Sequence, residues 1–435
     1  MERSIDLHLK AWFTSKRRKA MLLRGARQVG KTWSVRELGK QAKYFCELNF
    51  EEDKDLARFF SGSLAPEKIV EKLSAYKNCP IRAGETLLFF DEVQACPDAL
   101  RSLRFFYEKI PNLHIIAAGS LLEFALSEMP SFGVGRIQSL FMYPLSFREF
   151  LQAHEETIMI DYIGKLNRYD PIDHPLFEKL KEYYRTYLLI GGFPEVVESH
   201  IQNHDLLECM NILDDLILSF RDDFSKYKKH VPLLRLNETF QATATLAGGK
   251  FKFSNVNPHL PSYQIKDALE LLVLAGLAHK IYHTSAQGIP LGSQVNEKKF
   301  KVIPCDVGLY QRLLGLELAE ELIASDNDII NKGQSSEVVT GTELLVYSSA
   351  KNNAPLYYWH RESRGSNAEV DYLIEFEGDI IPLEVKTGDR GKMQSLRVFM
   401  STHDTPYGIR MSLENAGEYD DIKVVPACTI FRLFN

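Results

Sequence analysis

Residues 19–32 read KAMLLRGARQVGKT, an apolar strand pattern that runs into a loop bounded by glycines. The last eight residues match the spacing GxxxxGK[ST], and a helical pattern follows them. In this position backbone N–H groups can surround phosphate oxygens, Lys31 can neutralise phosphate charge and Thr32 can ligate Mg²⁺. A chance glycine turn before a helix is the alternative, and the order strand, loop, helix argues against it. The residues predicted to contact nucleotide are Gly25, Gln28, Val29, Gly30, Lys31 and Thr32.

Four more apolar runs alternate with helical patterns in the first part of the chain. They lie at 43–50, 86–90, 113–118 and 137–143. Short apolar strands that alternate with helices are typical of a mostly parallel α/β sheet, and such sheets bind ligands at the carboxyl ends of their strands. We therefore predict an α/β fold with a P-loop NTPase sheet.

Two carboxylates, Asp91 and Glu92, come directly after the run at 86–90. In this Walker B arrangement Asp91 would orient the shell of Mg²⁺, and Glu92 would polarise the attacking water as a general base. An acidic pair after a strand is by itself more often a solvated turn or a helix start. The phosphate loop upstream favours the functional interpretation.

Ser120 and Arg136 are further candidates for the same site. Ser120 follows the run at 113–118 and could either sense the γ-phosphate or cap the helix that begins after it. Arg136 precedes the run at 137–143 and could act as an arginine finger on the nucleotide of a neighbouring protomer, or be a surface arginine. The sequence leaves both pairs of alternatives open.

Near the C-terminus the sequence EVDYLIEFEGDIIPLEVKT indicates a β-hairpin of two alternating strands. A two-residue turn at 377–378 places Asp371 opposite Glu384, whereas a turn at 378–379 places Asp371 opposite Lys386. In either register these three side chains share one face, because side chains alternate with period two, and the other face is apolar.

The charged face of this hairpin could hold a metal. Facing carboxylates at Asp371 and Glu384 repel each other, and a divalent cation would turn that cost into a binding site. Lys386 could then position a water molecule or stabilise a pentacoordinate phosphate. The alternative is a hairpin with one solvated face.

The motifs, in the order in which they occur, resemble a known family over nearly the whole chain. It is the prokaryotic family of AAA+-type ATPases whose C-terminal domain, long labelled as of unknown function, looks like a PD-(D/E)xK nuclease. The phosphate loop is shared by many NTPases, whereas the PLSFREF, GGFPE and DVGL segments in this order are more specific. The segments that carry the resemblance are GARQVGKT at 25–32, LLFFDEVQ at 87–94, AAGS at 117–120, GR at 135–136, YPLSFREFL at 143–151, GGFPEVV at 191–197, CDVGL at 305–309 and the terminal DYLIE and LEVKTG.

The resemblance implies ATP and Mg²⁺ as ligands and assigns roles to residues of both sites. In the C-terminal segment it implies the pattern E…D…ExK, with Glu337 on a helix as its first member. The match of Glu337 rests on its spacing from Gly333, and a surface glutamate on a helix is an equal alternative. The predicted catalytic residues are Glu92, Arg136, Asp371, Glu384 and Lys386; the predicted metal ligands are Thr32, Asp91, Glu337, Asp371 and Glu384; and Ser120 joins the nucleotide-binding residues.

The remaining patterns divide the chain into four predicted segments. Two amphipathic helical patterns at 234–246 and 262–275, followed by short strands, have the order of a winged helix. The predicted segments are an AAA+-type P-loop ATPase core at 1–150, a helical extension at 151–225, a winged-helix-like segment at 226–310 and a nuclease-like α/β domain of the restriction-endonuclease type at 311–435.

Composition limits the partners. The 435 residues include 45% hydrophobic and 25% charged residues, which excludes a lone small module and broad disorder. A net charge of −6 argues against a uniformly basic nucleic-acid coat, so contact with nucleic acid, expected to be DNA, requires a local patch. Basic runs at 16–19, 226–230 and 298–301 are candidates, although such runs are usually solvated surface.

The cysteines and apolar runs predict the compartment. Six cysteines lie scattered without a CxxC pair, which fits a reducing environment better than a disulfide scaffold or a zinc site. The first residues show no apolar run of signal-peptide type, and no stretch approaches the length of a membrane span. We predict a cytoplasmic protein without a membrane partner.

Two functions compete on this basis. The first is an ATPase whose hydrolysis moves or licenses a Mg²⁺-dependent nuclease domain acting on DNA, with a homo-oligomer completing the ATP site. The second is a nucleotide-switched regulator whose C-terminal domain binds a nucleic acid or protein partner without cleaving it. A protein-remodelling ATPase ranks below both, because no pore loop can be recognised.

Overall fold

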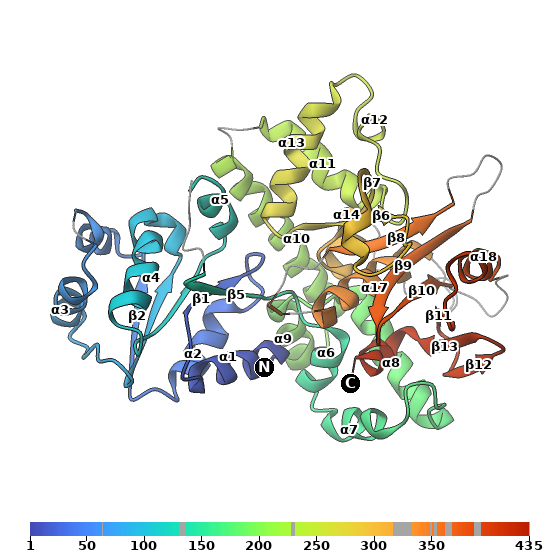
Figure 1. Ribbon diagram of the computed structural model, residues 1–435, viewed down its shortest axis with the longest axis horizontal. Coiled ribbons are helices and arrows are strands. Elements are labelled where there is room, and N and C mark those ends of the chain that lie inside the picture. Colours follow the sequence, from blue (N-terminus) through green and yellow to red (C-terminus); the bar gives the residue numbers. More distant parts are fainter. Residues whose placement is uncertain are drawn as a thin grey trace. The chain divides into compact units, whose positions relative to one another are not determined.

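The structure is a computed structural model that divides into two compact units (Figure 1). The N-terminal unit comprises residues 1–143 with 274–276 and 349–353, and the C-terminal unit comprises 144–273, 277–348 and 354–435. The structure describes residues 1–62, 64–129, 135–227, 231–315, 333–348, 350–351, 355–361, 368–386 and 393–434.

A five-stranded parallel sheet forms the centre of the N-terminal unit. Its strand order is β2-β3-β4-β1-β5. The strands are β1 (Ala20–Arg24), β2 (Tyr44–Asn49), β3 (Thr86–Asp91), β4 (His114–Ala118) and β5 (Ile137–Phe141). All five sequence-predicted strands are present, with ends that agree within two residues, so the predicted parallel α/β sheet is confirmed.

Helices connect these strands and cover the sheet. They are α1 (Ser4–Thr14), α2 (Lys31–Gly39), α3 (Pro66–Lys77), α4 (Pro97–Lys109) and α5 (Leu122–Ser127), with 3₁₀ turns at Lys54–Phe60 and Val93–Ala95. Proline opens α3 and α4 in the first turn, where the missing N–H costs no hydrogen bond.

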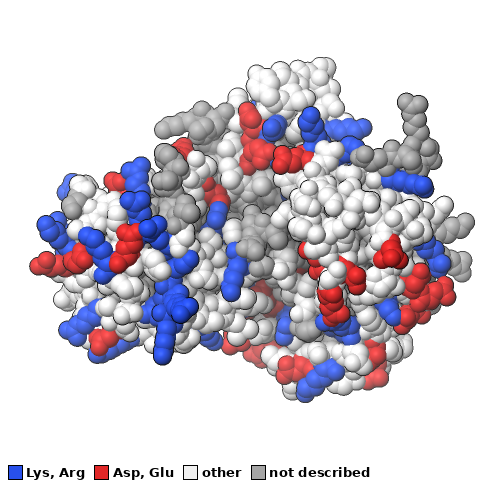
Figure 2. All heavy atoms as spheres, viewed as in Figure 1, with Lys and Arg blue, Asp and Glu red and all other residues white. Residues whose placement is uncertain are grey.

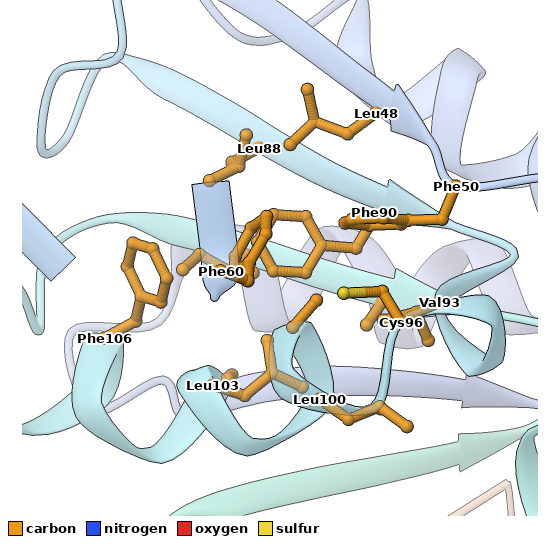
Figure 3. Packing of buried hydrophobic residues seen from close by; sticks show 14 of the residues in the cluster. Leu48, Phe50, Phe60, Leu88, Phe90, Val93, Cys96, Leu100, Leu103 and Phe106 are labelled. Carbon is orange, nitrogen blue, oxygen red and sulfur yellow. The ribbon is translucent and has the colours of Figure 1, made fainter. Parts of the chain in front are cut away.

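The core of the N-terminal unit follows from the period of the strands. In β3, Leu88 and Phe90 point to the same face, and both are fully buried (Figure 3). The ring of Phe90 meets Phe106 of α4 edge to face, with ring centroids 6.2 Å apart. This packing fixes the strand that ends in Asp91.

The C-terminal unit begins with helices, as the predicted helical extension requires. They are α6 (Phe147–Ala153), α7 (Thr157–Lys165), α8 (His174–Ile190), α9 (Pro194–Asn203) and α10 (Leu206–Asp223), followed by a 3₁₀ turn at Phe224–Tyr227. The later helices are α11 (Leu233–Thr245), α12 (Phe253–Val256), α13 (Ser262–Leu274), α14 (Val307–Leu313), α17 (Gly333–Ser348) and α18 (Gln394–His403), and a 3₁₀ segment spans Ala427–Leu433.

An eight-stranded mixed sheet runs through the C-terminal unit in the order β12-β13-β11-β10-β9-β8-β6-β7. Its strands are β6 (Ala278–Thr284), β7 (Val295–Pro304), β8 (Leu356–His360), β9 (Glu369–Phe376), β10 (Asp379–Val385), β11 (Gly408–Ser412), β12 (Gly417–Tyr419) and β13 (Ile422–Pro426). The pairing of β6 with β8 is parallel, and Ile281 lies beside Leu356.

This pairing corrects one expectation. Strands β6 and β7, expected as part of a separate winged-helix-like segment, belong to the same sheet as the C-terminal strands. The backbone N–H and C=O groups along the second edge of β6 pair with β8 rather than with water. The predicted boundary between residues 310 and 311 therefore does not separate two compact bodies.

The GGFPE and CDVGL segments contact each other inside the C-terminal unit. The carboxylate of Asp306, 2% exposed, accepts hydrogen bonds from the backbone N–H of Gly192 at 2.7 Å and of Leu309 at 2.9 Å. The second bond caps α14. A Cβ on Gly191, whose φ is +71°, would lie 2.1 Å from Asp306, so no larger residue fits. These two motifs stabilise the unit.

Glu343 of α17 connects the PLSFREF segment to α8. Its Oε1 accepts hydrogen bonds from the backbone N–H of Phe147 at 2.8 Å and from the hydroxyl of Tyr187 at 3.2 Å. The side chain is 1% exposed, and burial raises the pKa of Glu343 to about 8.

We expect Glu343 to make the stability of the C-terminal unit fall as pH rises from 4.5 to about 8. Between these values the folded protein holds a proton that the unfolded chain releases, so this group lowers the free energy of unfolding by up to about 1.4 kcal/mol per pH unit. Denaturant unfolding over a pH series measures the slope, and Glu343→Gln should remove this part of it. Glu198→Gln, on the exposed side of α9, is the matched control. An unchanged slope in Glu343→Gln contradicts the prediction.

Candidate functional site

The predicted phosphate loop lies between β1 and α2, and its backbone takes conformations that only a few residues accept. Gly25, Gln28 and Gly30 have φ angles of +141°, +64° and +96°. A Cβ on Gly25 would lie 2.0 Å from the carbonyl oxygen of Met142, so a side chain cannot fit there. Gly30 is the N-cap of α2, where free N–H groups favour an anion.

Lys31 is folded into this loop. Its ammonium donates hydrogen bonds to the carbonyl oxygens of Ala26 at 2.6 Å and Gly25 at 3.0 Å, and the residue is 8% exposed. Burial lowers the pKa of Lys31 to about 8, against the opposing charges of Glu92 and Asp91. The ammonium of Lys31 thus lies in the loop, where it can neutralise the charge of a bound phosphate.

Arg3 holds the other side of the loop and was not expected from the sequence. Its guanidinium donates to the carbonyl oxygens of Val29 and Tyr143, both at 2.7 Å. Arg3 is 7% exposed and is the N-cap residue of α1, so a buried charge at the start of the first helix fixes the loop.

Thr32 and Asp91 meet at the carboxyl edge of the sheet. The hydroxyl of Thr32 lies 3.2 and 3.3 Å from the two carboxylate oxygens of Asp91. Burial, and then the charge of Glu92, raises the pKa of Asp91 to about 6. A hydroxyl beside a buried carboxylate is a donor set that Mg²⁺ prefers, and a cation would offset the cost of burying that charge. These residues fit the expected ion.

Glu92 is oriented by two neighbours. Its Oε2 accepts hydrogen bonds from the side-chain amide of Gln94 at 2.7 Å and from the N–H and hydroxyl of Ser120, both at 3.2 Å. The φ of Glu92 is +47°, an uncommon conformation for a residue with a side chain, and such strain clusters at functional sites. A carboxylate held in this way has the orientation that the predicted general base would need; that role stays a prediction.

The structure decides between the two alternatives for Ser120 and adds Gln94 to the site. Helix α5 begins at Leu122 with Leu121 as its N-cap and no side-chain cap, so the capping alternative for Ser120 is wrong. Gln94 was missed, although it stands in the DEVQ segment two residues after Glu92. A Cβ on Gly119 would lie 1.8 Å from the Gln94 side-chain oxygen, which explains the glycine in AAGS.

Arg136 does not join these residues. It precedes β5, whose first residue Ile137 lies beside Ala20 at the start of β1, whereas the phosphate loop follows the end of β1. Arg136 therefore lies at the amino ends of the strands, away from the phosphate loop at their carboxyl ends, and it pairs with Glu108 of α4. A role for Arg136 on a neighbouring protomer stays a prediction.

The C-terminal hairpin uses the first of the two predicted registers. Its turn residues are Glu377 and Gly378, with φ angles of +52° and +94°. The register runs from Asp379 opposite Phe376 to Leu383 opposite Tyr372. The next pair in the same register is Asp371 and Glu384, so the alternative with Lys386 opposite Asp371 is wrong.

Both hairpin carboxylates are largely buried, which argues against a solvated face. The side chains of Asp371 and Glu384 are 12% and 5% exposed. Asp371 accepts a hydrogen bond from the backbone N–H of Val385 at 2.9 Å, and Glu384 Oε1 lies 2.6 Å from the ammonium of Lys386. Burial raises the pKa of Glu384.

The second carboxylate oxygen of Glu384 is available to bind a cation. Within the described ranges Glu384 Oε2 is buried without a hydrogen-bond partner, although the backbone N–H of Leu396 is near enough to lower the pKa of Glu384. A buried carboxylate oxygen without a donor, beside Asp371, suits a hard cation such as Mg²⁺. The described part of the chain contains no group of three or more His, Cys, Asp or Glu residues that could hold a metal ion.

Two further residues complete this cluster: Lys301, expected only as part of a surface basic run, and Glu369, which the sequence did not single out. Lys301 of β7 is 1% exposed, and its ammonium lies 2.7 Å from Glu369, 3.6 Å from Asp371 and 3.7 Å from Glu337. Glu369 stands two residues before Asp371, and this period-two spacing was the available signal. Burial, and then the charge of Asp371, raises the pKa of Glu337 to about 8. Glu337 thus lies with the cluster, as its predicted role requires.

Some of the lysines and arginines in the predicted basic patches are not exposed at the surface. In the 298–301 run Lys298 is exposed but Lys301 is buried. Arg18 of the 16–19 run donates to the carbonyl oxygens of Ser15 and Asn112. Residues 228–230 of the third run lie outside the described residues. On the face drawn in Figure 2, Lys and Arg are interspersed with Asp and Glu.

Two further predictions concern cysteines and membranes. All six cysteines are free thiols. No helix within the described ranges has both the length and the apolar character that crossing a membrane requires.

Comparison with family models divides the chain into three matches. Residues 17–151 match the model described as AAA domain, residues 181–320 a domain of unknown function (DUF8612), and residues 332–430 another domain of unknown function (DUF4143). None of the curated proteins compared matches the chain. The two C-terminal matches carry no described activity, so the winged-helix-like and nuclease-like assignments stay predictions.

Two solved structures with partial similarity to this chain cover most of their own length. The Walker-type ATPase PABY2304 of Pyrococcus abyssi is 16% identical, with 72% of this chain and 95% of that chain covered and a TM-score of 0.47. The ORC1 protein of Aeropyrum pernix, solved in complex with DNA, is 13% identical, with 73% and 92% covered and a TM-score of 0.29. The family match and the loop geometry agree: residues 17–151 carry a P-loop ATPase domain of the AAA type.

Proposed function

We propose that the N-terminal unit binds ATP with Mg²⁺ and hydrolyses it. The observation that carries this proposal is the meeting of Thr32 with Asp91 at 3.2 Å, next to a Glu92 that Ser120 and Gln94 hold in place. Phosphate loop, metal ligands and general base thus share one edge of the sheet.

Each residue has a defined task in this proposal. Lys31 and the loop N–H groups bind the phosphates, and Arg3 keeps the loop in shape through the carbonyl of Val29. Thr32 and Asp91 would hold Mg²⁺, which neutralises charge on the phosphate oxygens when bound. Glu92 orients the attacking water and accepts its proton.

Lys31→Ala is expected to lower ATP turnover about 100-fold or more, because the variant loses the charge that faces the phosphates. Phosphate release with purified protein measures turnover, and a fluorescent ATP analogue measures binding. Lys40→Ala, at the exposed end of α2, is the matched control and should behave as wild type. Turnover at the wild-type rate in Lys31→Ala contradicts the ATPase proposal.

For the C-terminal unit we propose a Mg²⁺-dependent phosphodiesterase site that acts on nucleic acid, expected to be DNA, and that ATP hydrolysis licenses. Two observations support this proposal: the hairpin register, continued by one pair beyond Leu383 and Tyr372, sets Asp371 opposite Glu384, and Glu384 Oε2 is buried without a hydrogen bond of good geometry in the described residues. Asp371 and Glu384 would hold the ion, and Lys386 would stabilise negative charge on the phosphate.

One observation favours the alternative of binding without cleavage. The ammonium of Lys301 already lies between Glu337, Glu369 and Asp371, where a catalytic ion would need carboxylate oxygens. The deciding experiment is a cleavage panel over DNA and RNA with Mg²⁺ or Mn²⁺, with and without ATP. ATP-dependent capture of nucleic acid or of a protein without cleavage would support a regulatory switch instead.

Assembly is the last part of the proposal. A homo-oligomer would bring Arg136 of one protomer toward the nucleotide of the next, since in its own chain Arg136 lies at the opposite edge of the sheet from the phosphate loop. This geometry supports a role between protomers only.

A further inference from the structure

Lys301 is a buried ammonium that neither the sequence motifs nor the proposed reactions use. It stands on β7 at 1% exposure, and its Nζ lies 2.7 Å from Glu369 Oε1, 3.6 Å from Asp371 Oδ1 and 3.7 Å from Glu337 Oε2. A buried charge survives only when it is paired, and here three carboxylates from two elements supply the pairing.

The fold leaves this ammonium little freedom. In the antiparallel pairing of β6 and β7, Lys301 lies opposite Ile281. Its backbone also forms an isolated bridge with Lys250. The ring of Tyr358 lies 5.3 Å from its Nζ. The ammonium is therefore built into the sheet rather than resting on its surface.

The charged groups that surround the Lys301 ammonium are mainly carboxylates. Burial alone would lower the pKa of Lys301, and Glu337, Asp371 and Glu369 together raise it above its ordinary value. Among the described residues, Lys250 lies 3.9 Å from Glu369, His360 is the cross-strand neighbour of Glu369, and Lys386 pairs with Glu384. The ammonium of Lys301 lies 3.6 Å from Asp371 Oδ1.

A second observation, independent of the acidic cluster, indicates that the site takes a ligand. Glu384 is 4% exposed, and within the described residues its Oε2 makes no hydrogen bond of good geometry, the backbone N–H of Leu396 being only near enough to lower the pKa of Glu384. By the hairpin register Glu384 faces Asp371. One carboxylate of the pair thus has an open acceptor, while the other is shared with Lys301.

We propose that Lys301 is a tethered cation that holds Glu337, Glu369 and Asp371 in place and competes with a divalent metal ion for Asp371. This inference rests on the proposed C-terminal site and adds its regulation: the ammonium keeps divalent affinity low. A metal ion at Asp371 would share that carboxylate with the ammonium of Lys301, whose Nζ lies 3.6 Å from Asp371 Oδ1, and two cations held by one buried carboxylate repel each other.

Binding of Mn²⁺ tests this inference without any measurement of activity. Purified full-length wild type and Lys301→Met are titrated with Mn²⁺ in the absence of nucleotide, and electron paramagnetic resonance measures free Mn²⁺. Lys301→Met is expected to bind Mn²⁺ about tenfold or more tightly than wild type. Adding Asp371→Asn to Lys301→Met should remove that gain, which assigns it to this site. Lys298→Met, which removes an exposed charge from the same strand, should leave Mn²⁺ binding at the wild-type level.

Equal or weaker Mn²⁺ binding by Lys301→Met overturns the inference. If Lys301→Met does not fold, the pair Glu369→Gln and Lys301→Met/Glu369→Gln replaces it, because the double variant removes the ammonium together with its nearest carboxylate. The double variant must then bind Mn²⁺ more tightly than Glu369→Gln alone. If wild type cleaves nucleic acid but Lys301→Met binds Mn²⁺ no more tightly, this inference is rejected and the proposed nuclease is kept. If Lys301→Met binds Mn²⁺ more tightly but no cleavage occurs, this inference is kept and the proposed nuclease is rejected.

Discussion

Glu92→Gln protein is expected to bind ATP as wild type does and to hydrolyse it about 10²–10⁴-fold more slowly. Glutamine keeps the size of the side chain and can still contact Ser120, but it cannot accept a proton from water. Thr32, Asp91 and Lys31, which bind the metal and the phosphates in our proposal, are untouched. The variant should therefore separate binding from chemistry.

Two measurements check this result on the same protein. Equilibrium binding of an ATP analogue should stay within a few-fold of wild type, and steady-state phosphate release should fall by the stated factor. Glu85→Gln is the matched control, because Glu85 directly precedes β3 at the end of the strand opposite Asp91. Phosphate release at an undiminished rate in Glu92→Gln would assign the base to another residue.

The N-terminal site was predictable because its parts are local in the sequence. The loop at 25–32 and the pair Asp91-Glu92 each follow a strand directly, and parallel strands bring their carboxyl ends to one edge. The hairpin was predictable for the same reason, since its two-residue turn sets the register. Only the choice between two neighbouring turns had to come from the structure.

Contacts between distant residues could not be predicted. Arg3 reaches Val29 because α1 packs beside the loop, and the sequence before the first strand gives no sign of it. Lys301 appeared to belong to an exposed basic run, yet the parallel pairing of β6 with β8 carries it into the sheet beside Glu369. The same pairing joins the expected winged-helix-like segment to the C-terminal sheet.

The resemblance of a segment to the family also did not reveal what that segment does. The segments that resemble the family most specifically contact one another: Gly192 donates its N–H to Asp306, and its carbonyl oxygen accepts from the N–H of Leu145. Glu343, outside these segments, binds Phe147 of the first of them. Buried carboxylates that bond backbone N–H groups stabilise a fold, and nothing in their sequence pattern separates them from catalytic acids. Position in the structure makes that distinction.

Asp371→Asn is expected to abolish the proposed metal-dependent cleavage of nucleic acid, with a loss on the order of 10³-fold, while ATP hydrolysis stays at the wild-type level. Asparagine keeps the shape of the side chain and can still accept from the N–H of Val385, but it removes the charge that faces Glu384 and would hold the ion. Cleavage of labelled DNA and RNA at saturating Mn²⁺ measures the loss, and phosphate release from ATP is followed in parallel.

Asp379→Asn is the control for this experiment, because Asp379 is exposed at the turn end of the same hairpin and pairs with Phe376, away from Glu384. It should cleave as wild type does. Cleavage at the wild-type rate by Asp371→Asn would show that the hairpin is not the reacting site. If wild type cleaves neither DNA nor RNA at saturating Mn²⁺, whereas Lys301→Met does, the ammonium among the carboxylates is what separates a binding domain from a nuclease in this chain.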